Sequence, residues 1–399
     1  MTPPYAVLTL VVALAATPQQ ASAAPLNSSA DPSSGMQLQL PTKVGEVAPA
    51  LLRQQAILRT AERWVEVDKE IGLIPENVAL QRFAEIRRSK DALSEATTLL
   101  TNEQSSPDPE QLKRQEEALR WFIRPVMTLC EGLPWVKNKS TEFGYLVDKQ
   151  KQKIKELSAS VGLLTTYDLD DRSNLTRRAE AGTAIAIGPR LVITNKHVVK
   201  NGRLGYQQVS TGTWKLFSQV VAQIEFPKEY ARCPDKLVST TVRVTGIAYA
   251  DPDPDADFII LTTDKDVPPA VVFAAKPDVV DAEEVGVIGY PGRPAVDFLL
   301  PQQIDEIFET PDNKVSFPNV RLSVGRTLPS QNTLLWNYDA TTWGGSSGSL
   351  LISLRSGQVI GLHTDGLYAS KEGLSYNRAL VSSRIAAWQQ GAVRSGLGK

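Results

Sequence analysis

The stretch TTWGGSSGSLLI, residues 341–352, places three glycines and three serines between a tryptophan and an apolar run. A flexible Gly/Ser linker is one interpretation, but bulky Trp343 and the strand-like run 350–354 press on both sides of it. The alternative is a tight turn that exposes one hydroxyl and directs backbone N–H groups at a common point. Ser347 is the candidate, because Gly345 lies two positions before it and Gly348 directly follows it.

The chain has only two histidines, His197 and His363. His197 follows the strand-like run RLVIT; a lone histidine there is usually a surface or core residue. As a catalytic base it needs an acceptor that fixes one ring nitrogen. Asp257 offers that acceptor at the start of the apolar run 258–261, and we favour it over Asp255 because it adjoins the strand.

The acidic segment before Asp257 is also consistent with two structural roles. It is either a loop that caps a strand or a calcium loop, since Asp251, Asp253 and Asp255 alternate as oxygen ligands do. The glycine and terminal glutamate of an EF-hand are missing, which argues against calcium. We expect no metal and no cofactor.

The second half of the chain follows the period of β-strands. TAIAIGPRLVIT, residues 183–194, predicts two short strands around a Gly-Pro turn. Similar runs with turn residues between them predict an all-β sandwich or a pair of barrels. SSRIAAWQQG, residues 382–391, predicts a short amphipathic helix.

The first half is organised differently. Apolar residues at intervals of three to four predict amphipathic helices, so we expect a helical module over 44–165 and a linker over 166–180. The apolar run Tyr5–Ala16 and the pattern Ala21-Ser22-Ala23 predict a signal peptide over 1–23, although no Lys or Arg precedes the run. A leader that does not direct export is the alternative. A Ser/Pro-rich disordered lead-in over 24–43 completes this part.

The segments TNKHVV, DADFIIL and GGSSGS, in that order, resemble the chymotrypsin-fold serine peptidases. GYPG, residues 289–292, and GLHTDG, residues 361–366, make the chain most similar to the bacterial glutamyl-endopeptidase (V8-like) branch. The resemblance implies an all-β double barrel over 181–399, with six-stranded barrels at about 181–280 and 285–382 and a helix at 383–392.

The resemblance also implies the roles of the site residues. His197 and Asp257 from the first barrel and Ser347 from the second would form the catalytic triad. The backbone N–H groups of Gly345 and Ser347 would form the oxyanion hole. HtrA-like proteases have similar segments but continue into a PDZ domain, for which we expect no room after Ser347.

Substrate preference is expected at three further positions. Thr341 stands where an aspartate would select Arg or Lys, so a trypsin-like preference is not expected. Thr342 and His363 match the places that line the acidic-residue pocket of the glutamyl-specific branch; the alternative is that His363 only packs. Ser346 departs from the Asn or Asp usual in that branch.

Composition limits the partners. The net charge of −1 disfavours a nucleic-acid-binding face, and two cysteines, Cys130 and Cys233, exclude a cysteine-based zinc site while leaving open whether they pair. We expect protein or peptide substrates, no membrane span and a secreted or periplasmic protein. The helical module is expected to bind either a partner or the protease domain itself. A catalytically silent or latent binding protein, regulated by that module, is the alternative function.

Overall fold

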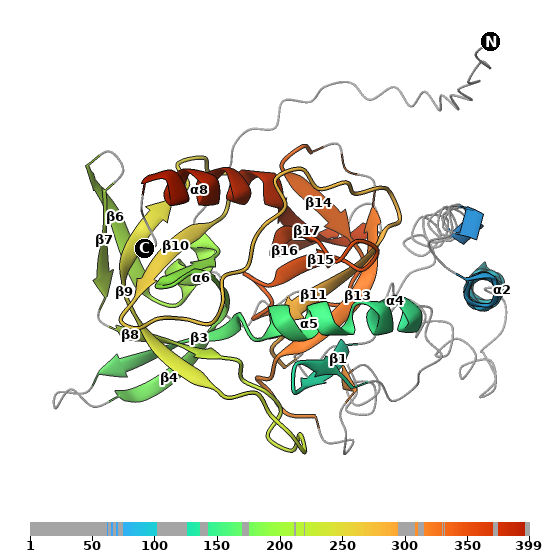
Figure 1. Ribbon diagram of the computed structural model, residues 1–399, viewed down its shortest axis with the longest axis horizontal. Coiled ribbons are helices and arrows are strands. Elements are labelled where there is room, and N and C mark those ends of the chain that lie inside the picture. Colours follow the sequence, from blue (N-terminus) through green and yellow to red (C-terminus); the bar gives the residue numbers. More distant parts are fainter. Residues whose placement is uncertain are drawn as a thin grey trace, which may run out of the picture. The chain divides into compact units, whose positions relative to one another are not determined.

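The computed structural model describes residues 75–101, 126–135, 143–169, 175–210, 213–218, 220–293, 308–309, 315–328, 330, 332–369 and 374–395, and a few positions between 62 and 70. The expected signal peptide and lead-in lie outside these residues. Two β-barrels lie side by side, with helix α8 running over them (Figure 1).

Six antiparallel strands close the first barrel in the order β10-β5-β4-β3-β8-β9. These are β3 (Val161–Leu169), β4 (Leu175–Gly188), β5 (Leu191–Thr194), β8 (Val220–Phe226), β9 (Thr240–Ala250) and β10 (Ile259–Thr263). Along the chain, β5 and β8 are separated by helix α6 (Lys196–Asn201) and by a hairpin of β6 (Leu204–Ser210) and β7 (Thr213–Ser218). Inward-facing side chains such as Leu164, Val192 and Ile224 are fully buried and fill this barrel.

The second barrel also has six strands, in the order β11-β15-β16-β17-β14-β13, and the pairing of β13 with β11 closes it. Its strands are β11 (Glu284–Gly289), β13 (Arg321–Leu328), β14 (Leu335–Tyr338), β15 (Leu350–Ser353), β16 (Val359–Ala369) and β17 (Leu374–Val381). The predicted pair of six-stranded barrels is therefore confirmed. Helix α8 (Ser382–Ser395) follows at the C-terminal end, where the sequence predicted a helix.

The segment before the barrels is not purely helical. Strand β1 (Val126–Cys130) joins the sheet of the second barrel, antiparallel to β13 and parallel to β12 (Phe308–Glu309), and it also pairs with the short β2 (Leu133–Pro134). Helices α4 (Gly144–Lys149) and α5 (Lys151–Ser158) bury Leu146, Ile154 and Leu157 in the core that the barrels share. The run VMTLC buries four of its five residues, which favours a strand over a helix.

The expectation of a linker over 166–180 is wrong, because strands β3 and β4 cover most of these residues. The two strands pair from Val161↔Ile185 out to Leu169↔Leu175. Their outer ends carry exposed and charged residues, such as Glu180, so this part of the hairpin resembles a polar loop in sequence. The first barrel accordingly begins at Val161, twenty residues before the expected position 181.

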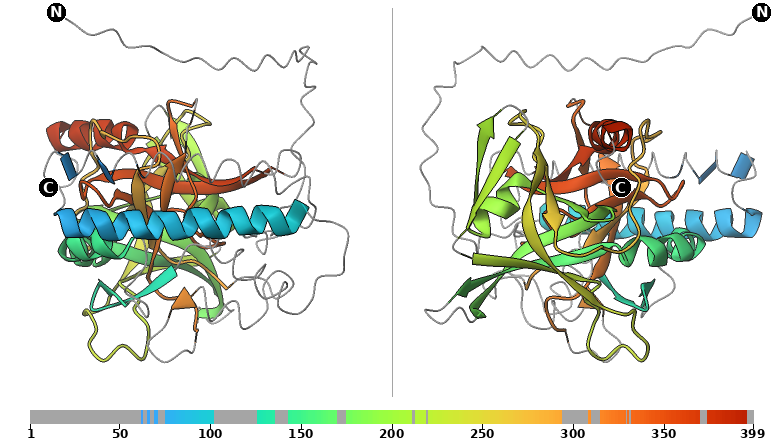
Figure 2. Two further views of the ribbon diagram at one scale, coloured as in Figure 1. Left: turned by 90° about the vertical axis from the view of Figure 1, so that its right-hand side faces the viewer. Right: turned by 60° about the vertical axis from the view of Figure 1, so that its left-hand side comes forward.

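Besides the pairing of β1 and the packing of α4 and α5, a disulfide and an ion pair between described residues attach the part of the chain before Val161 to the barrels. Cys130 of β1 forms a disulfide with Cys233, in the connection between β8 and β9. Helix α2 (Glu76–Thr101) lies on the outer side of the second barrel (Figures 1 and 2), where the guanidinium of Arg82 pairs with the carboxylate of Glu284. Both side chains of this ion pair are almost completely buried. Among the helices described, not one has the length and apolarity needed to cross a bilayer.

Candidate active site

His197 lies in the first turn of α6, directly after the fully buried strand β5. Asn195 precedes the helix and is itself buried, and its side-chain Nδ2 donates to the backbone carbonyl of Asp257 over 2.8 Å. This bond ties the strand-to-helix turn to the neighbouring segment that carries Asp257. The backbone that presents the imidazole is thereby held by strand β5 before it and by the hydrogen bond of Asn195 to the Asp257 segment.

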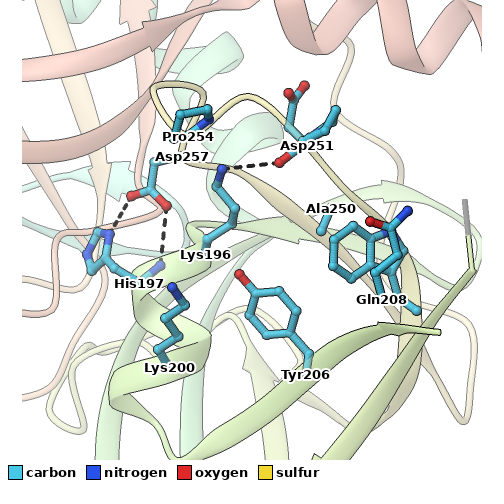
Figure 3. A pocket seen from close by; sticks show the side chains of 11 residues that line it. Lys196, His197, Lys200, Tyr206, Gln208, Ala250, Asp251, Pro254 and Asp257 are labelled. Atoms are coloured by element: carbon cyan, nitrogen blue, oxygen red, sulfur yellow. Dashed lines mark hydrogen bonds and ion pairs between the residues drawn. The ribbon is translucent and has the colours of Figure 1, made fainter. Parts of the chain in front are cut away.

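Asp257 holds His197 through both carboxylate oxygens (Figure 3). Its Oδ2 lies 2.5 Å from the imidazole Nδ1, and its Oδ1 accepts the backbone N–H of His197 over 3.2 Å. Burial works against ionisation of Asp257, but the hydrogen bonds and charge of His197 and the backbone N–H of Lys196 outweigh it, so the pKa of this carboxyl lies below its ordinary value. Because an ionised carboxylate only accepts, Nδ1 carries the proton and Nε2 is left to accept one.

Ser347 lies on a turn that requires two glycines. Gly345 and Gly348 have φ angles of +91° and +87°, in the region that side chains rarely adopt. A Cβ on Gly348 would overlap the carbonyl oxygen of Thr183, and one on Gly345 would lie 2.5 Å from that of Tyr290. The glycine-rich stretch is therefore a packed turn and not a linker.

The first barrel holds this turn in place. The backbone N–H of Thr183, in β4, donates to the carbonyl of Ser347 over 2.9 Å, and the Thr183 hydroxyl donates to the carbonyl of Gly345 over 2.9 Å. From the second barrel, Gly348 N–H donates to the carbonyl of His363 over 2.9 Å. Residues of both barrels thus determine where Ser347 stands.

The Ser347 hydroxyl donates to the backbone carbonyl of Thr364 over 3.1 Å. Within the described part of the chain, no hydrogen bond joins it to His197. The structure therefore brings His197 and Asp257 into direct contact and leaves the Ser347 hydroxyl bonded to Thr364, which follows His363 within β16.

Backbone N–H groups of the turn divide into two sets. Those of Ser346, Gly348 and Ser349 donate to carbonyls of Trp343, His363 and Ser346, respectively. Those of Gly345 and Ser347 have no acceptor among the described residues. These two groups are the ones that the sequence assigned to an oxyanion hole, and they are available to an incoming oxygen.

Thr341, Thr342 and His363 are all buried. The Thr342 hydroxyl donates to the side-chain oxygen of Asn377 over 2.7 Å, whereas the Thr341 hydroxyl has no hydrogen-bond partner in the described residues. Nδ1 of His363 hydrogen-bonds the hydroxyl of Tyr338, which is completely buried. Burial, chiefly, lowers the pKa of His363 to about 4, so that its imidazole is neutral at pH 7.

A cavity of about 390 Å³ adjoins the imidazole–carboxylate pair (Figure 3). Its walls come from α6, from the β6–β7 hairpin and from the loop that leads to Asp257, and they include Lys200, Tyr206, Trp214 and Pro254. The rings of Tyr206 and Trp214 pack edge to face, with 5.8 Å between their centroids. Burial and the nearby Asp257 carboxylate raise the pKa of Tyr206, so its hydroxyl stays protonated.

Several of these neighbours were not found from the sequence. Tyr338 and Asn377 reach His363 and Thr342 only through the pairing of β14, β16 and β17, which the sequence does not specify. Asp251, considered as a calcium ligand, instead accepts hydrogen bonds from Arg384, Tyr249 and the backbone of Asp253. No cluster of three or more potential metal-binding side chains occurs in the parts of the chain that the structure covers.

Comparison with known proteins agrees with the fold. Residues 182–362 match the family described as trypsin-like peptidase domain. A probable serine protease of Lysobacter enzymogenes is 25% identical over 264 residues, which cover 58% of this chain and 63% of that protein. The match thus spans less than two thirds of the relative's own length.

Solved structures resemble the chain more distantly. Deg5 is 14% identical, with a TM-score of 0.37 over 60% of this chain and 91% of that chain. The active form of the protease Rv3671c from M. tuberculosis is 21% identical, with a TM-score of 0.35 over 59% and 81%. The two barrels and the family match support a serine peptidase of chymotrypsin-type fold; neither bears on the glutamyl-specific branch.

Proposed function

We propose that this chain is a serine endopeptidase in which Ser347 attacks a peptide carbonyl. The observation that carries the proposal is the short hydrogen bond between His197 Nδ1 and the Asp257 carboxylate. The same fold holds Ser347 next to Gly348, in a turn where two N–H groups have no acceptor in the part of the chain that the structure describes. His197 Nε2 takes the Ser347 proton as the bond to the carbonyl carbon forms, and the amide nitrogen leaves with that proton. Water then hydrolyses the acyl-enzyme by the same route.

Two features of the site would lower the activation barriers of these steps. The ionised Asp257 stabilises the imidazolium that forms when His197 takes the proton. The N–H groups of Gly345 and Ser347 stabilise the oxyanion, and each such donor contributes about 10²–10³-fold to kcat in related chemistry. To enter this pathway the Ser347 hydroxyl must rotate away from the Thr364 carbonyl toward His197.

We further propose that the enzyme prefers an acidic residue before the cut. Because His363 is neutral and buried, it would recognise a carboxylate by hydrogen bonding and not by charge. The Thr342 hydroxyl would join it by turning its hydrogen from Asn377 to the substrate. Peptides that differ only as Glu or Gln at this position test the idea. We expect at least about a tenfold higher kcat/KM for Glu; equal values, or preference for basic or large apolar residues, would contradict it.

A latent form is the second candidate, favoured by the hydrogen bond of Ser347 to Thr364. In this form the N-terminal part binds the protease domain, an arrangement that the buried Arg82–Glu284 pair supports. A secreted or periplasmic location remains our proposal, and the Cys130–Cys233 disulfide supports it because such bonds persist in oxidising compartments.

Labelling with a fluorophosphonate probe tests the activity. We expect the wild type to label, Ser347→Ala not to label, and peptide hydrolysis to fall by about 10⁴-fold or more in Ser347→Ala. Ser356→Ala, on an exposed turn, is the matched control and should label as the wild type does. Labelling in neither the wild type nor the control favours the latent or silent protein.

A further inference from the structure

The loop between β9 and β10 brings Asp257 to His197, and Asp251 is at the centre of its hydrogen bonds. The Asp251 side chain is 1% exposed. Its Oδ1 accepts the backbone N–H of Asp253 over 3.0 Å, and its Oδ2 accepts the hydroxyl of Tyr249 over 3.1 Å. These contacts fold the loop around one buried carboxylate.

Arg384 neutralises that carboxylate from outside the barrel. Its Nη2 donates to Oδ1 of Asp251 over 2.9 Å and its Nε to Oδ2 over 3.1 Å, in a two-point geometry that fixes direction as well as distance. Although burial of Asp251 opposes its ionisation, the bonds from Arg384, Asp253 and Tyr249 outweigh it, and the pKa of this carboxyl is lowered. Hydrogen bonding to Asp251 in turn raises the pKa of Arg384.

Arg384 stands on a fixed support, the first turn of α8. Ile385 and Ala386 of this helix are buried in the main core. Gln389 donates to the carbonyl of Val271 over 2.8 Å and accepts the N–H of Phe273 over 3.1 Å. The ring of Trp388 packs against that of Tyr249, with 5.8 Å between the ring centroids. The C-terminal helix is therefore held firmly enough to hold the loop.

Lys196 holds the loop from the histidine side (Figure 3). Its ammonium donates to the carbonyls of Asp251 and Asp253, over 3.2 and 2.7 Å. Because Lys196 directly precedes His197, these bonds join the backbone of the base to the backbone that leads to Asp257. Helices α8 and α6 thus both hold the start of the loop at Asp251 and Asp253, and Asn195 holds its end at the carbonyl of Asp257.

We propose that Arg384 and Asp251 are positioning residues, which set the orientation of the Asp257 carboxylate toward Nδ1 of His197. The inference rests on the proposed peptidase function and deepens it. Without Arg384 the buried Asp251 carboxylate would keep the hydrogen bonds of Tyr249 and Asp253 but lose its counter-ion, so the loop would move to hydrate it. Asp257, six residues along the same loop, would move with it. A displacement of about 1 Å at a catalytic group lowers rates by about 100-fold.

Kinetics of four variants provide the first measurement. Arg384→Ala and Asp251→Asn should lower kcat by about tenfold to 100-fold, and this loss should exceed any rise in KM, because the movement reaches the reacting groups. Arg384→Lys, which keeps the charge but loses the two-point geometry, should recover part of the loss. Arg190→Ala breaks an exposed ion pair with Asp266 elsewhere on the first barrel and should leave kcat unchanged.

The tautomer of His197 gives a measurement that does not require activity. The chain has two histidines, so ¹⁵N-histidine spectra contain two residues, assigned with His363→Gln. At about pH 8.5, above the ordinary range of imidazole, the wild type and Arg190→Ala should carry the His197 proton on Nδ1. Arg384→Ala should shift this proton toward Nε2, because the acceptor that selects Nδ1 has moved.

The two measurements separate the two proposals. An Nδ1 signal in Arg384→Ala identical to the wild type overturns the positioning role, whatever happens to kcat or to the melting temperature. A lower melting temperature with unchanged tautomer and kcat means that the ion pair is only structural, and also overturns it. A wild type that neither hydrolyses peptides nor labels contradicts the peptidase, while the tautomer still decides the positioning role.

Discussion

Gly348 shows how one residue determines the shape of the candidate nucleophile turn. Its φ of +87° and its contact with the Thr183 carbonyl leave no space for a Cβ. We expect Gly348→Ala to lower the free energy of unfolding by about 2 kcal/mol or more through backbone strain and overlap, and to abolish probe labelling. Urea denaturation and labelling rates measure the two effects.

Gly357→Ala is the matched control for this prediction. Gly357 also has a positive φ, +73°, but a Cβ there meets only the end of the flexible Gln150 side chain. Gly357→Ala should lower the free energy of unfolding by a similar amount through backbone strain, and it should leave probe labelling unchanged. Equal labelling by both variants would mean that the turn around Ser347 does not need the geometry described.

His363 should make stability depend on pH. Its folded pKa is about 4 and its ordinary value is 6.5, so between these values the unfolded chain binds more protons. Stability should therefore fall as pH is lowered from about 6.5 to about 4, by up to about 3 kcal/mol from this residue. Glu283, whose pKa burial raises, acts in the opposite direction.

Comparing the wild type with His363→Gln isolates this contribution, because Glu283 is present in both. Unfolding free energies across this pH range should show a weaker acid destabilisation in the variant. Identical pH dependence in the two proteins would show that the imidazole is not held neutral by burial.

At the scale of single residues, the sequence indicates candidate site residues but not the groups to which they hydrogen-bond. His197, Asp257 and Ser347 were candidates because the chain has few histidines, Asp257 precedes an apolar run and glycines lie close to the serine; the structure joins the first two by a hydrogen bond, and their catalytic roles stay predictions. The Thr364 carbonyl, which binds the Ser347 hydroxyl, has no sequence signal, since any residue provides a carbonyl. The roles of Thr342 and His363 in substrate preference stay predictions.

Among the elements, the β6–β7 hairpin forms the outer wall of the cavity beside His197. We expect Trp214→Ala to raise KM for extended peptides severalfold, because it removes an aromatic surface on which a bound chain would pack. Labelling by a small fluorophosphonate should be unchanged, since the probe needs only Ser347 and its neighbours. Kinetics with long and short peptides distinguish these effects.

Thr213→Ala provides the control in the same strand. Successive residues of a strand point to opposite faces, so Thr213 faces away from Trp214. Equal KM values for Trp214→Ala and the wild type on every peptide would show that substrates do not use the cavity.

The elements also show where sequence patterns mislead. The Gly-Pro turn between β4 and β5 and the helix α8 were predictable from turn residues and helical period. The outer part of the β3–β4 hairpin was not, because strands that extend beyond a barrel expose both faces and lose the alternation of apolar and polar residues. Strand β1 was missed because five residues are too few to show a period.

In the whole molecule, the N-terminal part and the barrels are joined more closely than the sequence indicated. Strand β1 belongs to the sheet of the second barrel, and its disulfide with Cys233 attaches it to a connection of the first barrel. Strand β3 pairs with both β4 and β8. The two-domain division expected from the change of period therefore falls in the middle of a closed barrel.

Chains of different length test this integration. A chain that begins at residue 170 lacks β3, so the paired edges of β4 and β8 would be exposed and the first barrel could not close. We expect it to be insoluble, or soluble without probe labelling. A chain that begins at residue 120 keeps β1, Cys130, α4, α5 and β3 and should fold with the cooperativity of the full chain. Soluble expression, thermal unfolding and labelling compare the three lengths.

The same set of chains tests latency, because the chain from residue 120 lacks α2 and its buried Arg82. If the N-terminal part restrains the active site, this shorter chain should label faster than the full chain. Equal rates would contradict the restraint while leaving the peptidase proposal intact. Efficient folding and labelling of the chain from residue 170 would instead contradict the requirement for β3, since a barrel that closes without it cannot depend on its pairings.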